Sequence, residues 1–303
     1  METKFEPSGV LLIDKPEGVT SHDVVGKVRR LYNTRRVGHT GTLDPMATGV
    51  LVVLIGRAAK AAEYLVSDSK VYRATLRLGI TTDTEDTTGT VLTESNDIPD
   101  AAQVAKTVSS FLGTTKQVPP MYSALKVGGQ KLVDLARRGI EIEREAREIT
   151  IHRITCEPID ERSYALEVAC SSGTYIRTLC ADIGKVLGCG GAMASLRRME
   201  TGGFSLAECH TLEALEALDS EARLAALVPT EALFSALPSL KLPAFYERLS
   251  RNGCEIYLKK LGVSHPVGTR LRVCGANGSF FAVGEVREYA DGAAVKIIKL
   301  FDV

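Results

Sequence analysis

Few folds can accommodate residues 38–55, where a loop rich in glycine leads directly into six consecutive apolar residues, 50–55. An apolar run of this length is typical of a strand that is covered on both faces of its sheet. Such a strand requires packed layers of further strands and helices around it. The glycines at 38, 41 and 49 allow sharp turns and a close approach of the backbone to a ligand. We therefore expect a buried strand that begins directly after a loop accessible to a ligand.

The rest of the chain shows strand and helix patterns without a regular order. Apolar residues at every second position predict half-buried strands over 71–78 and 164–170. Helical spacing of apolar residues predicts helices over 21–32 and 174–188. Because strand–helix–strand units do not repeat along the chain, the sequence favours an α+β fold over a doubly wound α/β fold.

The expected helices have recognisable ends. Ser21 and Thr174 carry side-chain oxygens that can accept hydrogen bonds from the free N–H groups of a first helical turn, and Gly188 is suited to end the second helix. A further helix, rich in alanine and leucine, is expected over 211–227. These assignments place Arg177 in the first turn of the helix that Thr174 begins.

The character of the sequence changes after Pro238. An Asn-Gly pair at 277–278 and an Asp-Gly pair at 291–292 are typical of hairpin turns, and both lie between short apolar runs. The length of 303 residues also fits two domains. We therefore predict a large domain over 1–236 and a small β-rich domain over 237–303.

Composition restricts the environment and the partners of the chain. Lys and Arg number 37, as do Asp and Glu, but acidic residues are concentrated in 200–230, so zero net charge still permits a local basic groove for a polyanion. No apolar run is long enough to span a membrane, and residues 1–7 do not lead into a secretory signal. Seven cysteines without a CxxC pair favour a reducing cytoplasm and argue against disulfides or a zinc site. Without a heptad pattern, we expect a monomer.

Asp44 and Arg177 are the first candidates for chemistry. Asp44 lies in the glycine-rich loop, and Pro45 favours an extended conformation at Asp44, so its carboxylate is held in a tight loop before a buried strand. Arg177 opposes the helix dipole in a first helical turn, and a nearby anion such as Asp44 would compensate for this. Taken singly, each pattern also fits an ordinary surface residue.

Aromatic and basic residues form the second group of candidates. Tyr72 has basic neighbours, and an aromatic ring can stack on a base while cations hold phosphates, although buried tyrosines are also common. Lys126, Lys131 and Arg197 can bind RNA as a phosphate track if they converge. The acidic segment 83–86 lacks the spacing of a calcium loop, so we expect a turn there and no metal site.

Five stretches of the sequence resemble a known family. They read GVLLIDKPEGVTSHDVV at 9–25, GHTGTLDPMATGVL at 38–51, KVYR at 70–73, VPPMYSALK at 118–126 and SSGTYIRTL at 171–179. In order and spacing they resemble the TruB-type tRNA pseudouridine-55 synthases of bacteria. The resemblance implies a pseudouridine synthase fold, in which helices flank a mixed and mostly antiparallel sheet. It also implies a small C-terminal PUA-like domain that binds RNA.

The resemblance further implies an activity and its partner. Such an enzyme converts uridine 55 in the T loop of tRNA to pseudouridine by flipping the base, cleaving the C1′–N1 bond and rejoining C1′ to C5. The reaction is an isomerisation without redox change, so no cofactor is expected. The T stem-loop of tRNA is the expected partner. The short chain without lysine-rich tails is expected to act without a guide RNA.

Individual residues match the motifs of this family. Asp44 matches the essential aspartate, Tyr72 the tyrosine that stacks on the base, and Arg177 the arginine that pairs with the aspartate. Arg177 is expected to keep Asp44 ionised, because an adjacent cation lowers the pKa of a carboxylate. His39 matches a histidine that helps to fill the place of the extruded nucleotide. The residues that match the substrate pocket are Lys15, Tyr175 and Leu196.

Two other functions compete with isomerisation. A hydrolase would use Asp44 against a glycosidic bond and release free uracil, but no second acid is evident near Asp44 in the sequence, and most glycosidases need two. A non-catalytic protein would bind or fold tRNA, instead of catalysis or alongside it. The presence of Asp44, Tyr72 and Arg177 together argues against a protein that has simply lost its activity.

Overall fold

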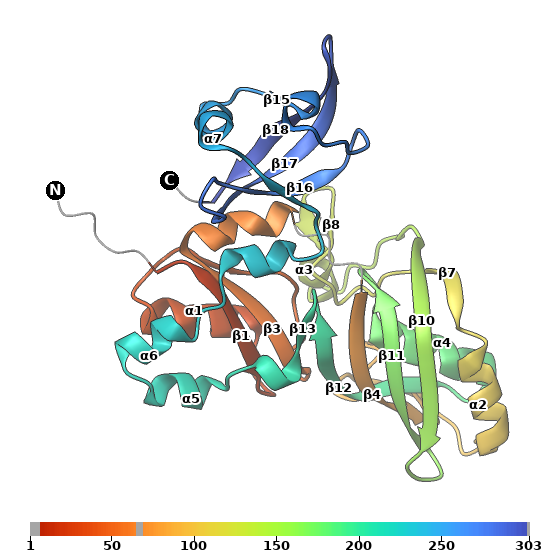
Figure 1. Cartoon of the computed structure of the whole chain (residues 1–303). Helices are drawn as coiled ribbons and strands as arrows, with labels where there is room; N and C mark the ends of the chain where they lie inside the picture. The colour runs from red at the N-terminus through yellow and green to blue at the C-terminus, as the bar shows by residue number, and fades with distance from the viewer. Residues whose placement is uncertain (1–6, 65–68, 302–303) are drawn as a thin grey trace.

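The computed structural model describes residues 7–64 and 69–301, and its larger sheet contains nine strands. Seven strands follow the order β1-β3-β12-β4-β11-β10-β7, while β2 pairs with β3 and β13 pairs with β12 (Figure 1). The pairs in this sheet are antiparallel except β3 with β12, so the predicted mixed and mostly antiparallel sheet is confirmed. The strands are β1 (Gly9–Lys15), β2 (Val37–His39), β3 (Thr48–Ile55), β4 (Ser69–Leu78), β7 (Gly113–Gln117), β10 (Arg147–Pro158), β11 (Ser163–Ser171), β12 (Gly191–Thr201) and β13 (Phe204–Ser205).

The expected buried strand is β3. Every residue from 50 to 55 is at most 2% exposed. Leu51 and Val53 share a core with the apolar face of α1 (Ser21–Leu31), while the alternate residues of β3 pack on the other face with η1 (Gly56–Tyr64). Layers on both faces therefore cover the strand, as its apolar sequence predicts.

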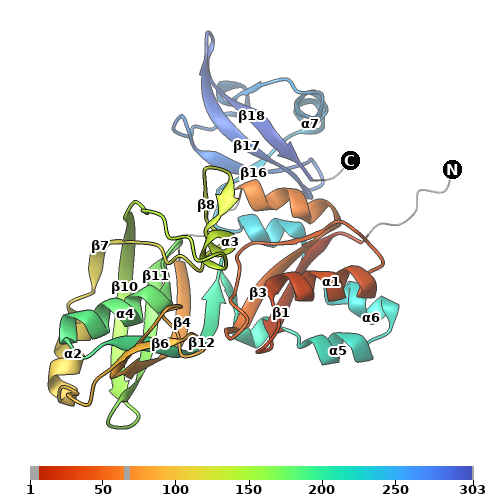
Figure 2. The same cartoon turned by 180° about the vertical axis from the view of Figure 1, so that it is seen from behind.

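Among the described residues, helices cover one face of the other half of the sheet and leave its second face open. In Figure 2, α2 (Ala101–Ser109) and α4 (Ile176–Leu187) lie together in front of β4, β10 and β11. The predicted alternation is confirmed, because the even-numbered residues of 72–78 and 164–170 are buried. One buried face and one open face explain this period of two.

The N-cap of α1 is Thr20 and not Ser21, so the predicted cap is wrong by one residue. Thr20 Oγ1 accepts a hydrogen bond from Asp23 N at 3.1 Å, and Asp23 Oδ2 accepts one from Thr20 N at 2.9 Å. This reciprocal pair satisfies N–H groups at the start of the helix. The Ser21 hydroxyl is left to bind Leu43 in the glycine-rich loop.

The N-cap of α4 is Tyr175 and not the predicted Thr174, whose Oγ1 donates to Ser171 O at 2.9 Å instead. The side chain of Gln117, at the end of β7, binds the backbone of Tyr175 on both sides. Tyr175 N donates to Gln117 Oε1 at 2.8 Å, and Gln117 Nε2 donates to Tyr175 O at 3.0 Å. Arg177 still lies in the first helical turn, as predicted.

The expected single helix over 211–227 is wrong. The structure has α5 (Leu212–Ala217) and α6 (Ser220–Ala225) in its place. Asp219 caps α6 by accepting a hydrogen bond from Ala222 N at 2.8 Å. The chain breaks there because an aspartate at this position stabilises a new N-terminus more than it stabilises a continued helix.

Two small excursions leave the main sheet beside the loop at 40–47. They consist of the hairpin β5 (Ile80–Thr82) and β6 (Val91–Glu94), and the hairpin β8 (Lys126–Val127) and β9 (Gln130–Lys131) with α3 (Leu132–Ala136) behind it. The acidic segment 83–86 connects β5 to β6, so the prediction of a turn is confirmed. Short 3-10 helices are η2 (Leu206–Glu208), η3 (Thr230–Phe234) and η4 (Leu258–Leu261).

The C-terminal region forms a second, five-stranded sheet with its own apolar core. The Asn-Gly and Asp-Gly pairs lie in its two hairpin turns, where Gly278 and Gly292 have φ values of 86° and 106°, as expected. This sheet lies above the first region in Figure 1. Its elements are β14 (Ser239–Lys241), α7 (Ala244–Arg251), β15 (Ile256–Tyr257), β16 (Arg270–Cys274), β17 (Phe280–Tyr289) and β18 (Gly292–Leu300).

An aromatic cluster joins the two regions. The ring of Phe234 lies 5.6 Å from that of Phe280 and 5.2 Å from that of Phe301. In the described residues, no helix is both long and apolar enough to cross a bilayer. Most of the N-terminal segment judged for a secretory signal, residues 1–6, lies outside the described residues.

Candidate active site

The order of three strands brings the glycine-rich loop close to Tyr72. β12 lies between β3, which begins directly after the loop, and β4, which carries Tyr72. Arg198 of β12 is opposite Gly49 on one side and Tyr72 on the other. A Cβ on Gly49 would lie 2.2 Å from Arg198 O, and the φ of Gly49 is 100°. Glycine is therefore required for this close pairing of β3 with β12.

Hydrogen bonds fix the loop on either side of Asp44. Leu43 N donates to Ser21 Oγ at 2.9 Å, and Ser21 Oγ donates to Leu43 O at 3.0 Å. Lys15 Nζ donates to Pro45 O at 3.3 Å. Residues of α1 and β1 thus fix the backbone next to Asp44. The Asp44 carboxylate remains free to bind partners on the other side of the site.

Lys15 and Arg198 support this loop from its buried side. Lys15 is fully buried, donates also to Val19 O at 2.7 Å, and has its pKa lowered to about 8 by burial. The Lys15 ammonium binds backbone carbonyls on the buried side of the loop, and its predicted place in the substrate pocket stays a prediction. Arg198 is 1% exposed and donates to Val50 O at 2.7 Å and to Gly41 O at 3.1 Å. Sequence analysis did not single out Arg198 and so missed this role.

Arg177 binds Asp44 and two backbone carbonyls. Its Nε lies 3.0 Å from Asp44 Oδ2, so the predicted ion pair is confirmed. Nη1 donates to Thr84 O at 3.0 Å, and Nη2 donates to Tyr122 O at 2.7 Å. The Arg177 side chain is 6% exposed, whereas that of Asp44 is 37% exposed. The guanidinium is therefore a fixed support, and the carboxylate remains accessible.

A second carboxylate, Asp86, also faces Arg177. Asp86 Oδ2 lies 3.6 Å from Arg177 Nη1, and both side chains are 6% exposed. Its Oδ1 accepts hydrogen bonds from Thr84 Oγ1 at 2.8 Å and from Thr88 N at 3.0 Å. Backbone bonds to Met193 of β12 hold the turn in place on the main sheet. All of the Asp86 oxygens are therefore engaged within the protein.

Sequence analysis missed Asp86 as part of the site. Acidic residues in turns are mostly exposed, so a buried member of the segment 83–86 is not expected from local pattern. The threonines at 84 and 88 are the only available signal, since hydroxyl groups can satisfy a buried carboxylate. Nothing in their spacing points to Arg177.

Burial dominates the ionisation of the site. The pKa of Asp44 is raised, because burial disfavours the carboxylate more than the Arg177 charge favours it, and the negative charge of Asp86 adds to the rise. The expected lowering of the Asp44 pKa by Arg177 is therefore present, but burial outweighs it. Burial also raises the pKa of the Tyr72 hydroxyl.

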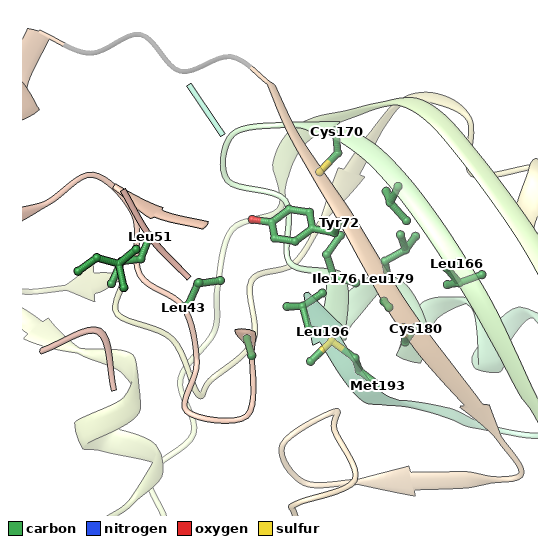
Figure 3. Packing of buried hydrophobic residues seen from close by; sticks show 14 of the residues in the cluster. Leu43, Leu51, Tyr72, Leu166, Cys170, Ile176, Leu179, Cys180, Met193 and Leu196 are labelled. Atoms are coloured by element: carbon green, nitrogen blue, oxygen red, sulfur yellow. The ribbon is translucent and has the colours of Figure 1, made fainter. Parts of the chain in front are cut away.

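The predicted catalytic residues meet at one cavity of about 320 Å³. Tyr72 projects from β4 with its hydroxyl directed toward the loop that carries Leu43, and Leu196 lies beside its ring (Figure 3). The cavity combines an aromatic ring, a half-exposed carboxylate and an apolar wall. The predicted residues that line it are Asp44, Tyr72, Tyr175, Arg177 and Leu196.

Besides Lys15, four predicted residues lie away from this cavity. His39 ends β2 and is half-buried, and burial lowers its pKa. Lys126 and Lys131 are exposed and face each other in the hairpin of β8 and β9. Arg197 forms an ion pair with Asp14, with 2.7 Å between Nη2 and Oδ2. The proposed contacts of these residues with RNA stay predictions.

The cavity suits chemistry on a flat ring joined to a sugar. Tyr72 can stack on the ring, and Asp44 can attack an electrophilic carbon or accept a proton. Arg177 orients the carboxylate from behind. Within residues 7–64 and 69–301, no group of three or more His, Cys, Asp or Glu side chains is arranged to hold a metal ion.

Comparisons with known proteins agree with this geometry. A model of the TruB family pseudouridylate synthase N-terminal domain matches residues 29–176, and one of the tRNA pseudouridylate synthase B C-terminal domain matches residues 177–235. The tRNA pseudouridine synthase B of Clostridium kluyveri is 44% identical over 294 residues, which cover 97% of this chain and 99% of the relative. That of Dechloromonas aromatica is 48% identical over 230 residues, which cover 76% and 77%.

Solved structures share the fold. A chain of a Cbf5-Nop10-Gar1 complex aligns with a TM-score of 0.73 and 25% identity, covering 97% of this chain and 85% of that chain. A chain of the archaeal box H/ACA sRNP Nop10-Cbf5 complex aligns with a TM-score of 0.71 and 24% identity, covering 98% and 86%. The predicted fold class, including a C-terminal β-rich PUA-like domain, is confirmed.

Proposed function

This chain belongs to the TruB family of pseudouridine synthases, and we propose that its cavity converts uridine 55 in the T loop of tRNA to pseudouridine. The curated relatives are named tRNA pseudouridine synthase B, and this chain is a tRNA pseudouridine synthase. One observation carries the assignment of the site: the Asp44–Arg177 ion pair lines the same cavity as Tyr72.

Asp44 is the catalytic carboxylate in this proposal. The C1′–N1 bond breaks, the uracil rotates, and C1′ joins C5, while the proton at C5 leaves and N1 gains one. Covalent addition of the carboxylate to the base or C1′, and removal of a proton from the sugar, both require an ionised carboxylate within reach of the nucleotide. Arg177 supports that ionised form and fixes its direction. The partial exposure of Asp44 supports its contact with substrate.

The other site residues bind the extruded nucleotide. Tyr72 stacks on the uracil, while Tyr175 and Leu196 form further parts of the wall. Extrusion of a base costs about a few kcal/mol, and His39 offsets part of this cost by occupying the vacated place. Lys126, Lys131 and Arg197 contact phosphates outside the cavity.

We also propose how the chain is divided and where it acts. Residues 1–236 form the catalytic domain, and residues 237–303 form an RNA-binding domain. The separate sheet and the separate core of the C-terminal region support this division. The protein acts as a monomer in the cytoplasm on the T stem-loop of tRNA, without a guide RNA and without a cofactor.

The test measures tritium release from tRNA labelled at C5 of uridine, together with direct detection of pseudouridine. Wild type should release tritium from one uridine of the T loop. Asp44→Asn should lose at least about 10⁴-fold in rate, as expected for loss of a catalytic nucleophile or base, and should still bind tRNA. Asp97→Asn is the matched control, because Asp97 is exposed and lies outside the cavity.

Two results would contradict the proposal. Release of free uracil would identify a hydrolase, and formation of pseudouridine at normal rate by Asp44→Asn would remove Asp44 from the chemistry. Isomerisation that occurs only after an RNA guide is added would contradict guide-independent action.

A further inference from the structure

One cation of the cavity takes no part in the ion pairs described above. Lys70 is the second residue of β4 and lines the cavity together with Asp44, Tyr72 and Arg177. Alternate residues of a strand point to the same face, so Lys70 lies on the face that carries Tyr72. Its side chain is half-buried. The known roles of the site leave this lysine without a function.

Among the side chains that line the cavity, Lys70 and Arg177 are cations and Asp44 is the one carboxylate. Arg177 faces two carboxylates, Asp44 at 3.0 Å and Asp86 at 3.6 Å. In the part of the chain that the structure describes, no hydrogen bond or ion pair engages the Lys70 ammonium. Burial and the charge of Arg198 lower the pKa of Lys70, as expected for a cation that lacks a counterion. A bound anion would supply that counterion.

Neighbouring cations are not available for this purpose. Arg198 is buried and donates to the carbonyls of Gly41 and Val50. Arg73, next along β4, is exposed on the opposite face and pairs with Glu167 at 3.5 Å. Lys70 is therefore the one cation lining this described cavity that can accept a new anionic partner without first losing another.

We propose that the Lys70 ammonium binds a backbone phosphate of the extruded uridine and so fixes the position of its base against Tyr72. The proposal rests on the proposed function, because it requires a nucleotide in the cavity. Two residues along a strand span roughly 7 Å, which is therefore the separation along β4 between Lys70 and Tyr72. In a nucleotide, the distance from the base to the phosphates, which lie on the far side of the sugar, is similar. The anion is the 5′ or the 3′ phosphate of that nucleotide.

The test combines a change in the protein with a change in the RNA. Lys70→Met, Lys70→Arg and wild type are measured for binding to a T stem-loop RNA and to two analogues. Each analogue carries a neutral methylphosphonate at the 5′ or the 3′ phosphate of the target uridine. Lys106→Met is the matched control, because Lys106 is an exposed residue of α2 outside the cavity.

The expected result is that the losses of RNA affinity caused by Lys70→Met and by the methylphosphonate are not additive. Lys70→Met should bind unmodified RNA about 10-fold more weakly, and its salt dependence should fall by about 0.7 of a log–log unit, as for one phosphate contact. One methylphosphonate analogue should bind wild type about 10-fold more weakly and should weaken Lys70→Met no further. Lys70→Arg should restore most of the binding, while Lys106→Met should behave as wild type does with all three RNAs.

Additive losses would overturn the proposal, as would equal sensitivity of wild type and Lys70→Met to both analogues. A loss of turnover in Lys70→Met with unchanged RNA affinity would also overturn it. Pseudouridine formation by wild type on unmodified RNA is measured first. A failure there contradicts the proposed function and is seen separately, since the binding comparison decides the role of Lys70 by itself.

Discussion

Two carboxylates approach the guanidinium of Arg177 from different loops, and their surroundings differ. Asp44 comes from the loop before β3, and Asp86 comes from the turn between β5 and β6. The Asp44 side chain is 37% exposed and lines the cavity with Tyr72. The Asp86 side chain is 6% exposed, and neighbouring threonines donate to it. Contact with the same arginine therefore leaves one carboxylate accessible from the cavity and one enclosed by the protein.

This difference also bears on the rival hydrolase. Sequence analysis found no second acid near Asp44, and the structure brings Asp86 to the same guanidinium. A glycosidase of the usual kind needs a second carboxyl group that can exchange a proton with substrate or water. The Asp86 side chain is 6% exposed, its Oδ1 accepts hydrogen bonds from the turn and its Oδ2 faces Arg177, so it is poorly placed for that role. The presence of two carboxylates does not favour hydrolysis here.

Arg177→Lys should have the largest effect on this comparison, because it removes the shared partner. A lysine has one compact ammonium group and cannot bind Asp44, Asp86 and two carbonyls together. We expect single-turnover pseudouridine formation at saturating enzyme to fall by at least about 10²-fold, as for misplaced catalytic groups. Binding of tRNA should change little. A variant within a few-fold of wild type would show that the orientation of Asp44 does not depend on the guanidinium.

Asp86→Asn should have a smaller effect, because Asp44 and Arg177 remain paired. Loss of a charged partner weakens the interactions that fix the Arg177 side chain by about 1.5 kcal/mol. This energy corresponds to a roughly 10-fold lower rate. The fall should appear in the single-turnover rate and not in the affinity for tRNA. Asp83→Asn is the matched control, since Asp83 is exposed in the same turn. A loss as large as that of Asp44→Asn would place Asp86 in the chemistry and end the distinction.

The pH dependence separates the two carboxylates further. A raised pKa means that Asp44 takes up its proton at a higher pH than an ordinary aspartate, whose pKa is 3.8. As the pH is lowered, kcat/KM should therefore begin to fall at a pH above 3.8. The charge of Asp86 contributes to that rise. In Asp86→Asn the acid limb should therefore shift to lower pH. An unchanged limb, or a shift upward, would show that Asp86 does not act on Asp44 through charge.

The two loops also differ in how far their sequences predict them. The glycine-rich loop is predictable because its glycines and the apolar run of β3 are local features. The pairing of Arg177 with Asp44 is predictable because a nearby anion compensates for an arginine in a first helical turn, and the family resemblance implies the same pair. The burial of Asp86, the burial of Lys15 under the loop and the net pKa of Asp44 depend on contacts between distant segments. No local pattern contains that information.

Thr88→Val should have the smallest effect. It tests whether Asp86 keeps its position after one of its hydrogen bonds is removed. The Thr88 hydroxyl donates to Asp86 Oδ1, which also accepts hydrogen bonds from Thr84 Oγ1 and Thr88 N. Loss of one such bond costs about 0.5–1.5 kcal/mol in unfolding free energy, measured by chemical denaturation. The rate of pseudouridine formation should fall less than about 3-fold, because the remaining donors keep Asp86 in place. Thr87→Val is the control, since Thr87 is exposed beside it. If Thr88→Val instead lowers the rate as much as Asp86→Asn does, then the position of Asp86 within the turn, and not its charge, governs Arg177.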